Sequence, residues 1–126
     1  MRIYRVEDGD GWGMYSGNMS MGDLSPSGDQ SSPRHPTPNN DSAIAEDYVN
    51  FCRGCAKERF GFATLAQLRA WIYKDAWLRT LDGWGYRLSI YEAPRAIVGN
   101  TQALFDLGSA TLTSRRSLLT LIRLRR

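Results

Sequence analysis

The chain has 126 residues, and its 42% apolar and 23% charged residues are typical of globular proteins. At this length we expect one domain, spanning residues 1–126. No apolar run reaches the roughly 20 residues that a membrane-spanning helix needs, and the first residues lack the apolar core of a signal peptide. Two cysteines exclude a disulfide scaffold. We therefore expect a cytoplasmic protein without membrane association.

The net charge of +3 conceals an asymmetry between the two halves of the chain. Residues 1–50 carry three basic and eight acidic residues, a net charge of −5, whereas residues 51–126 carry thirteen basic and five acidic residues, a net charge of +8. The stretch 113–126 is the most basic, and we interpret it as a basic C-terminal tail. Such a tail could attract a phosphate backbone or an acidic protein surface, or it could be a solvated terminus.

The chain begins with a predicted strand at 3–6, where aromatic and branched residues alternate with Arg5. A glycine-dense turn follows at 8–13. Residues 16–40 then form a stretch rich in Ser, Gly, Pro, Asn and Asp, which we predict to be a long flexible loop. A loop of this length is either a functional element or a passive insertion.

Three helices are predicted after this loop. Asp41 or Ser42 can cap a short helix through Asn50. Beyond a short strand at 60–62, Thr64 and Gln67 match a capping box at the start of the clearest helix, and a further short helix runs from about residue 75 to Gly83.

The remainder of the chain is β-like. Residues 86–91 alternate as in a strand with one buried face, formed by Tyr86, Leu88 and Ile90. Residues 96–98 and 101–105 predict a hairpin with a type II′ turn at Gly99. The end of the chain can be a helix or a strand. The predicted fold class is α+β, with a small, mostly antiparallel sheet and two or three short helices.

Cys52 and Cys55 form a CxxC pair, which can bind zinc or cycle as a redox dithiol, or can be two ordinary thiols. Zinc needs four ligands, and a second CxxC pair is absent from the sequence. We therefore predict no metal site.

Three residues of the polar loops are candidates for ligand binding. His35 is the only histidine and lies in a proline-restricted segment that is either a binding loop or an exposed turn. Trp12 and Tyr15 lie in or beside the glycine-dense turn, where an aromatic ring can stack on a ligand or fold back over the core.

Five motifs resemble a group of small phage and prophage proteins. These motifs are Ile3-Tyr4-Arg5-Val6-Glu7, Gly13-Met14-Tyr15, His35-Pro36-Thr37-Pro38-Asn39-Asn40-Asp41, the segment Phe60-Gly61-Phe62-Ala63-Thr64-Leu65-Ala66-Gln67-Leu68, and Ile90-Tyr91-Glu92-Ala93-Pro94. The resemblance covers residues 1–15 and 35–106. It implies a phage accessory protein, but it implies no particular activity.

This group in turn resembles, more distantly, the ADP-ribosyltransferase fold, which one anti-CRISPR protein also has. The resemblance implies NAD as a possible cofactor, with Tyr4 and Arg5 on the first strand and Thr64 at a helix start among the binding residues. It places Gln102 where such enzymes carry a catalytic glutamate, with Glu92 or Asp106 as a substitute. A neutral amide would stabilise an oxocarbenium-like transition state poorly.

Three functions remain open at this stage. The first is a counter-defence or host-takeover protein that binds and inhibits a host or defence protein. The second is an NAD-dependent ADP-ribosyltransferase-like enzyme, with Gln102 or Glu92 as catalytic residues and Arg5, Tyr4, Trp12, Tyr15, His35 and Thr64 binding the cofactor. The third is a nucleic-acid binder that uses the arginine-rich C-terminus.

Overall fold

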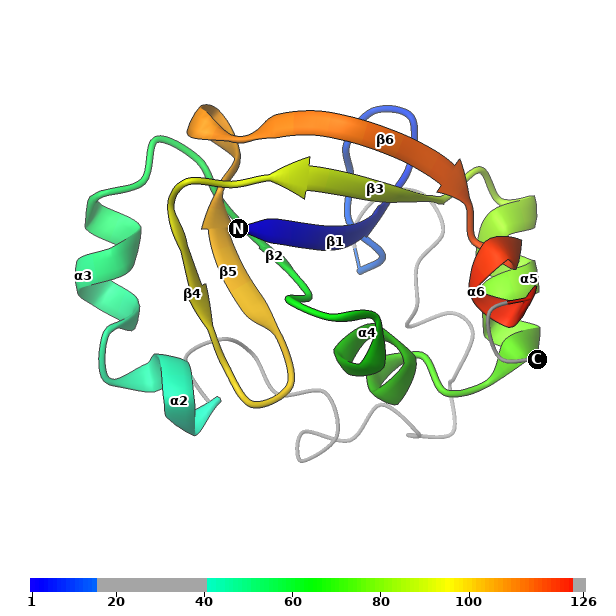
Figure 1. Ribbon diagram of the computed structural model, residues 1–126, viewed down its shortest axis with the longest axis horizontal. Helices are drawn as coiled ribbons and strands as arrows, with labels where there is room; N and C mark the ends of the chain where they lie inside the picture. Colours follow the sequence, from blue (N-terminus) through cyan, green and yellow to red (C-terminus); the bar gives the residue numbers. More distant parts are fainter. Residues whose placement is uncertain (16–40, 124–126) are drawn as a thin grey trace.

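The computed structural model describes residues 1–15 and 41–123, and two antiparallel three-stranded sheets form its centre. The first sheet has the order β1 (Arg2–Glu7), β3 (Arg87–Glu92), β6 (Thr111–Ser117). The second sheet has the order β2 (Glu58–Gly61), β5 (Ala103–Asp106), β4 (Ala96–Val98). The structure therefore confirms the predicted α+β class, with the strands divided between two sheets (Figure 1).

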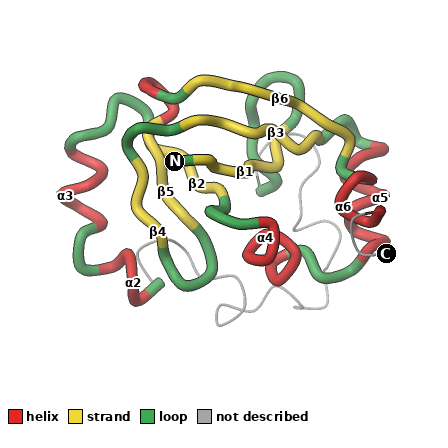
Figure 2. The backbone as a smooth tube through the Cα atoms, in the orientation of Figure 1, coloured by secondary structure: helices red, strands yellow, loops and turns green. Residues whose placement is uncertain are grey.

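Short helices lie at both ends of this β-structure. Next to β4 are α2 (Ser42–Ala45) and α3 (Tyr48–Arg53), and at the opposite end are α5 (Asp75–Gly83) and α6 (Leu119–Arg123) (Figure 2). Between them lie α4 (Leu65–Trp71) and, after β5, the 3-10 turn η2 (Leu107–Ser109). The described part of the chain thus holds more helices than the sequence predicted.

The start of α4 follows from its sequence. The Thr64 side chain accepts a hydrogen bond from the Gln67 backbone N–H at 3.0 Å. The Gln67 amide oxygen accepts a hydrogen bond from the backbone N–H of Ala63, the residue before the N-cap, at 2.9 Å. The first bond satisfies an N–H that a helix start leaves without a partner, and the second ties the preceding residue to the first turn, so the motif fixes where α4 begins.

The two sheets meet where β1 passes the end of β2. Tyr4 and Phe62 exchange two backbone hydrogen bonds, of 2.8 and 2.7 Å. Gly61 permits this approach, since a Cβ atom there would lie 2.7 Å from Ile3 Cγ2 and 2.8 Å from the Tyr4 carbonyl oxygen. The backbone junction therefore sets how the sheets lie relative to each other.

The two faces of β1 pack into two different cores. Val6 joins Leu88 and the apolar faces of α4, α5 and α6 in the larger core. Ile3 joins Tyr91 and Phe105 in a smaller core between the two sheets. Because strand residues alternate between faces, this pattern places Arg5 and Glu7 on the same face as Ile3.

A predicted helix and the burial of a predicted strand differ from the structure. The helix expected from residue 41 or 42 to residue 50 is two helices, α2 and α3, because the backbone N–H of Asp47 bonds to the Ile44 carbonyl and tightens the chain. In β3, Ser89 and Tyr91 are buried as well as Leu88. The strand is central in its sheet, and both of its faces are covered.

The hairpin of β4 and β5 is confirmed, but its predicted turn is wrong. Val98 pairs with Ala103, and the Gly99 N–H donates to the Gln102 carbonyl oxygen at 2.7 Å, so the chain turns at Asn100 and Thr101 rather than at Gly99 and Asn100. The backbone of Gly99 lacks the positive φ that a type II′ turn requires. The Asp41 carboxylate instead accepts hydrogen bonds from the backbone N–H groups of Asn100 and Thr101, both at 2.9 Å, and holds this turn.

Two further sequence predictions were a flexible loop at residues 16–40 and a basic tail at residues 113–126. The predicted flexible loop at 16–40 lies outside the described residues. The stretch interpreted as a basic tail begins inside β6 and continues into α6. Arg115 and Arg116 are therefore residues of the first sheet.

Candidate functional site

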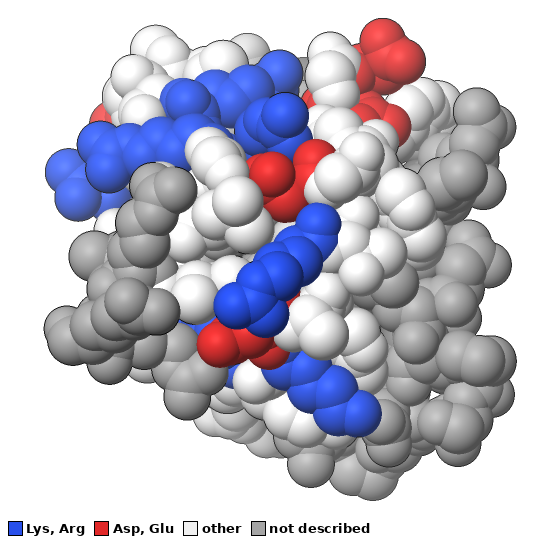
Figure 3. All heavy atoms as spheres, turned by 90° about the vertical axis from the view of Figure 1, so that its right-hand side faces the viewer, with Lys and Arg blue, Asp and Glu red and all other residues white. Residues whose placement is uncertain are grey.

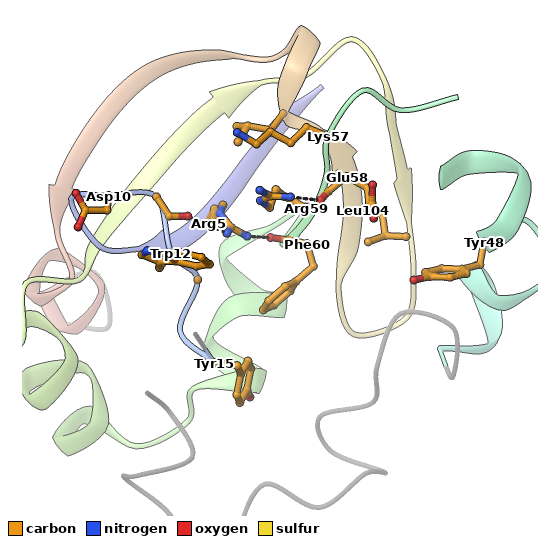
Figure 4. A pocket seen from close by; sticks show the side chains of 13 residues that line it. Arg5, Asp10, Trp12, Tyr15, Tyr48, Lys57, Glu58, Arg59, Phe60 and Leu104 are labelled. Atoms are coloured by element: carbon orange, nitrogen blue, oxygen red, sulfur yellow. Dashed lines mark hydrogen bonds between the residues drawn. The ribbon is translucent and has the colours of Figure 1, made fainter. Parts of the chain in front are cut away.

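A pocket of about 630 Å³ lies between the loop after β1 and the outer strand of the second sheet, β2 (Figure 4). Its lining combines cationic and aromatic side chains. The lining residues used below are Arg5, Trp12, Tyr15, Lys57, Arg59 and Phe60. The volume lies within the range of small-molecule sites.

The base of the pocket is formed by Arg5, whose side chain is almost fully buried. Its Nε donates to Glu7 Oε1 at 2.9 Å, and its Nη1 donates to the Phe60 carbonyl oxygen at 2.7 Å. Its Nη2 donates to the Gly11 carbonyl oxygen at 3.3 Å. One guanidinium thus ties β1 to β2 and to the loop that carries Trp12.

Glu7 completes this arrangement from beneath the pocket. Its Oε2 accepts a hydrogen bond from the Tyr91 hydroxyl at 2.6 Å and from Arg115 Nη2 at 2.8 Å. Arg115 Nε also donates to Ser89 Oγ at 3.2 Å. The buried carboxylate is therefore shared between two guanidinium groups and a phenol, and all three strands of the first sheet contribute.

The pKa values in this network follow from burial and hydrogen bonding. Burial raises the pKa of Glu7. Hydrogen bonds from Tyr91 and Ser89 and the charge of Arg5 lower the pKa by more than burial raises it, so it lies below its ordinary value of 4.5. Burial, together with the hydrogen bond to Glu7, raises the pKa of Tyr91 to about 12. Glu7 is therefore ionised and Tyr91 a neutral donor at neutral pH.

Two further cations line the pocket at β2. The Lys57 backbone N–H donates to Asp106 Oδ1 at 3.0 Å, which fixes the chain at the entrance to the strand. Arg59 Nη1 donates to the Glu58 carbonyl oxygen at 2.7 Å. Within residues 1–15 and 41–123, no ion pair involves Lys57 or Arg59. Their charges are available to an anion.

Aromatic side chains from the Trp12 loop and from β2 also line the pocket. Trp12 lies in the loop after β1 and is 56% exposed. Tryptophan side chains are mostly buried, so this exposure is unusual. The Tyr15 hydroxyl accepts a hydrogen bond from Trp71 Nε1 at 2.6 Å, and burial raises its pKa to about 12. The rings of Tyr15 and Phe60 lie 6.2 Å apart, centroid to centroid. An anionic group and a planar ring can thus be bound together.

Of the predicted binding residues, the structure brings Arg5, Trp12 and Tyr15 together in this pocket. Tyr4 lies on the opposite face of β1 and lines a different groove. Thr64 serves as the N-cap of α4. His35 lies outside the described residues.

The two predicted catalytic residues do not line the pocket. Gln102 is buried in the β4–β5 loop, where its carbonyl oxygen accepts a bond from Gly99. Glu92 is exposed at the end of β3 and pairs with the N-terminal amine at 2.7 Å. Of the described residues, Asp10 and Glu58 are the carboxylates that line the pocket.

Sequence reasoning missed Glu7, Lys57 and Arg59 as site residues. Glu7 stands two positions after Arg5, the spacing that places both side chains on one face of a strand. Lys57 and Arg59 have the same spacing, with Lys57 directly before β2 and Arg59 within it. The sequence signal was thus charge at alternate positions. This signal identifies site residues only once the pairing of the strands is known.

The CxxC pair shows no feature of a reactive site. Burial raises the pKa of the Cys52 thiol, whereas a reactive cysteine needs a lowered one. In the parts of the chain described here, His, Cys, Asp and Glu side chains form no group of three that could hold a metal ion.

The surface charge near the C-terminal end of the described chain is mixed. On the α5–α6 side, basic side chains lie beside acidic ones (Figure 3). Asp82 pairs with Arg87 at 3.3 Å, and Asp75 pairs with Arg69 at 2.5 Å. Arg115 is already engaged by Glu7. Among the described residues, basic and acidic side chains are therefore interspersed on this side.

The described helices are all too short to cross a bilayer. The structure at this point defines a small α+β protein with a buried ion-pair network beneath an aromatic and cationic pocket. Residues 1–119 match a family model described as bacteriophage T4 Y00F protein, and the chain belongs to this family. Neither a curated protein nor a solved structure matches it.

Proposed function

We propose that this phage protein acts in counter-defence or host takeover by binding and inhibiting a host protein or complex. Its membership of a phage protein family supports an accessory role in infection. The observation that carries the proposal is the position of the exposed Trp12 beside Lys57 and Arg59, over the Arg5–Glu7 network.

These side chains have the properties of a protein-binding centre. Tryptophan and arginine are the residues most enriched among those that dominate binding energy at interfaces. Lys57 and Arg59 add positive charge, which favours an acidic partner surface and accelerates encounter. Arg5 restrains the loop carrying Trp12, so less conformational entropy is lost when a partner binds.

Variants of the exposed Trp12 and the half-buried Arg59 test this function. The wild-type protein is used to isolate its partner from host cells, and the affinity of the purified pair is then measured with Trp12→Ala and Arg59→Gln. We expect each variant to weaken binding by at least about tenfold, since truncating a residue that dominates an interface costs about 2 kcal/mol or more. Circular dichroism confirms that each variant is folded.

Leu112→Ala is the matched control, because Leu112 is an apolar residue of β6 that is 46% exposed and does not line the pocket. It is expected to bind like the wild type. Unchanged affinity in Trp12→Ala and Arg59→Gln would contradict the proposed surface. Phage carrying Trp12→Ala should lose growth on the host strain in which the wild-type protein confers an advantage.

A second candidate function is binding of NAD or a related dinucleotide by an ADP-ribosyltransferase-like protein. It is favoured by the meeting of Arg5, Trp12 and Tyr15 in one pocket of suitable volume. In this candidate the rings stack on a base or on nicotinamide, while Lys57 and Arg59 contact the pyrophosphate. Chemistry at the glycosidic bond would require Asp10 or Glu58 rather than Gln102 or Glu92.

Calorimetric titration with NAD distinguishes this candidate. Arg5→Ala is a poor probe because it also breaks the contacts of Arg5 with Glu7 and Phe60. Trp12→Ala and Arg59→Gln leave that network in place. Heat of binding that is lost in both variants would support the cofactor, whereas no heat at about 1 mM NAD, where even a weak site would be half occupied, would contradict it.

A further inference from the structure

A second groove, of about 690 Å³, lies on the other face of the first sheet. Tyr4 of β1 and Leu88 and Ile90 of β3 line this groove. Arg5 and Glu7, at alternate positions of β1, lie on the opposite face of the sheet. Leu65 of α4 and Thr120 of α6 also line it. Figure 1 shows these two helices on the same side of the sheet. The groove is therefore separate from the pocket described above.

The charged residues lining this groove are both arginines. Arg2 extends from β1 and Arg116 from β6, and both are exposed. Among the described residues, no carboxylate lines the groove and neither arginine takes part in an ion pair. Glu92, the cross-strand neighbour of Arg2, pairs instead with the N-terminal amine. Arg116 Nε donates to Ser114 Oγ at 3.1 Å, which leaves its terminal N–H groups for another acceptor.

Hydroxyl groups supply further donors between the two arginines. Thr113 and Thr120 already donate to backbone carbonyl oxygens, at 2.9 and 2.7 Å. In the described part of the chain, the Tyr4 and Ser114 hydroxyls donate to no protein acceptor. The groove thus presents two guanidinium groups and two hydroxyl donors over an apolar floor.

We propose that this groove is a binding site for a phosphate group, with Arg2 and Arg116 as its cationic ligands and Tyr4 and Ser114 as hydroxyl donors. Guanidinium groups match the geometry of phosphate oxygens and form charge-assisted hydrogen bonds with them. Two cations balance the double charge of a phosphate monoester, and its oxygens accept hydrogen bonds from both guanidinium and hydroxyl donors. A carboxylate has one charge and two oxygens, so it uses this donor set less completely.

Titration of the full chain with inorganic phosphate at constant ionic strength tests the site. Binding is followed by the amide NMR shifts of β1 and β6. Arg2→Gln and Arg116→Gln should each weaken binding by about tenfold or more, the loss expected for a charge-assisted hydrogen bond. Arg79→Gln is the matched control, because Arg79 is an exposed arginine of α5 outside the groove.

The source of the phosphate is resolved by two further titrations, with a nucleoside monophosphate and with a short oligothymidine. Tighter binding of the first identifies a terminal phosphate as the ligand, and tighter binding of the second identifies a phosphodiester backbone. Equal effects of Arg79→Gln and Arg116→Gln, acetate binding as strong as phosphate binding, or no shift at about 10 mM phosphate would each overturn the proposal.

Discussion

The Glu7 carboxylate accepts hydrogen bonds from side chains of all three strands of the first sheet, and the geometry of the pocket depends on it. Arg5 of its own strand, Tyr91 of β3 and Arg115 of β6 all donate to its carboxylate. Arg5 in turn contacts the Trp12 loop and β2. A buried charge of this kind is tolerated because every partner is present, so removal of one partner leaves the others uncompensated.

Glu7→Gln is accordingly predicted to destabilise the protein by about 3 kcal/mol, the scale measured when one member of a buried ion pair is removed. The side-chain volume is nearly unchanged, so the loss reports the charge rather than packing. Urea unfolding followed by tryptophan fluorescence measures the difference.

The exposed Glu92→Gln variant, which breaks the pair with the N-terminal amine, is the control and should cost less than about 1 kcal/mol. If both variants unfold at the same urea concentration, Glu7 does not have the structural role assigned to it.

At the scale of elements, the contact of β1 with β2 sets the relation between the two sheets. Gly61→Ala would place a methyl group 2.8 Å from the Tyr4 carbonyl oxygen, a backbone atom that cannot move aside without disturbing the bridge to Phe62. We predict a loss of about 2 kcal/mol in unfolding free energy, as for other overpacked sites. Thermal unfolding followed by circular dichroism gives the change.

Gly83→Ala provides the comparison for Gly61→Ala. Gly83 ends α5, has no positive φ, and a Cβ atom there would meet nothing within 4 Å. Alanine at that position should therefore leave stability unchanged or raise it slightly. A Gly61→Ala protein as stable as Gly83→Ala would show that the junction can relax.

The elements that were predictable from sequence are those whose signals are local. The Thr64–Gln67 capping pattern located α4, and alternating residues located β1 and β3. The β4–β5 turn could not be predicted, because its shape depends on Asp41, nearly 60 positions away in sequence. Turn propensities describe only the residues of the turn itself.

The candidate site was only partly predictable for a related reason. Arg5, Trp12 and Tyr15 come from the first fifteen residues. The family resemblance indicated Arg5, and the glycine-dense turn indicated Trp12 and Tyr15. Lys57 and Arg59 reach the pocket only because β2 pairs with β5 and the Tyr4–Phe62 bridge joins the sheets. A charged residue in an edge strand is ordinarily interpreted as a solvated side chain.

At the scale of the whole molecule, buried carboxylates connect segments that are distant in sequence. Glu7 connects the three strands of the first sheet, and Asp41 connects α2 to the β4–β5 loop. Asp41 is 2% exposed, and although burial raises its pKa, the backbone donors of Asn100 and Thr101 hold it below the ordinary 3.8. Both groups must therefore be ionised for the native contacts to form.

This requirement predicts acid sensitivity of a defined sign. A carboxyl whose pKa is lower in the folded protein binds fewer protons there than in the unfolded chain, so its stabilising contribution is complete above its ordinary pKa and is lost as pH falls through the folded value. For Glu7 and Asp41 the loss begins near pH 4.5 and 3.8. Each group contributes at most about 1.4 kcal/mol per pH unit to the slope.

Urea unfolding at a series of pH values between neutrality and about pH 3, a range that spans both ordinary pKa values, measures this slope. The wild type should lose stability steeply at the acid end, whereas Glu7→Gln and Asp41→Asn should each have a lower stability at neutral pH and a shallower decline. Glu92→Gln, which removes an exposed carboxylate, should retain the wild-type slope. A wild-type slope in both buried variants would mean that other carboxylates control acid unfolding, and the two connections would then not be the points at which the fold first gives way.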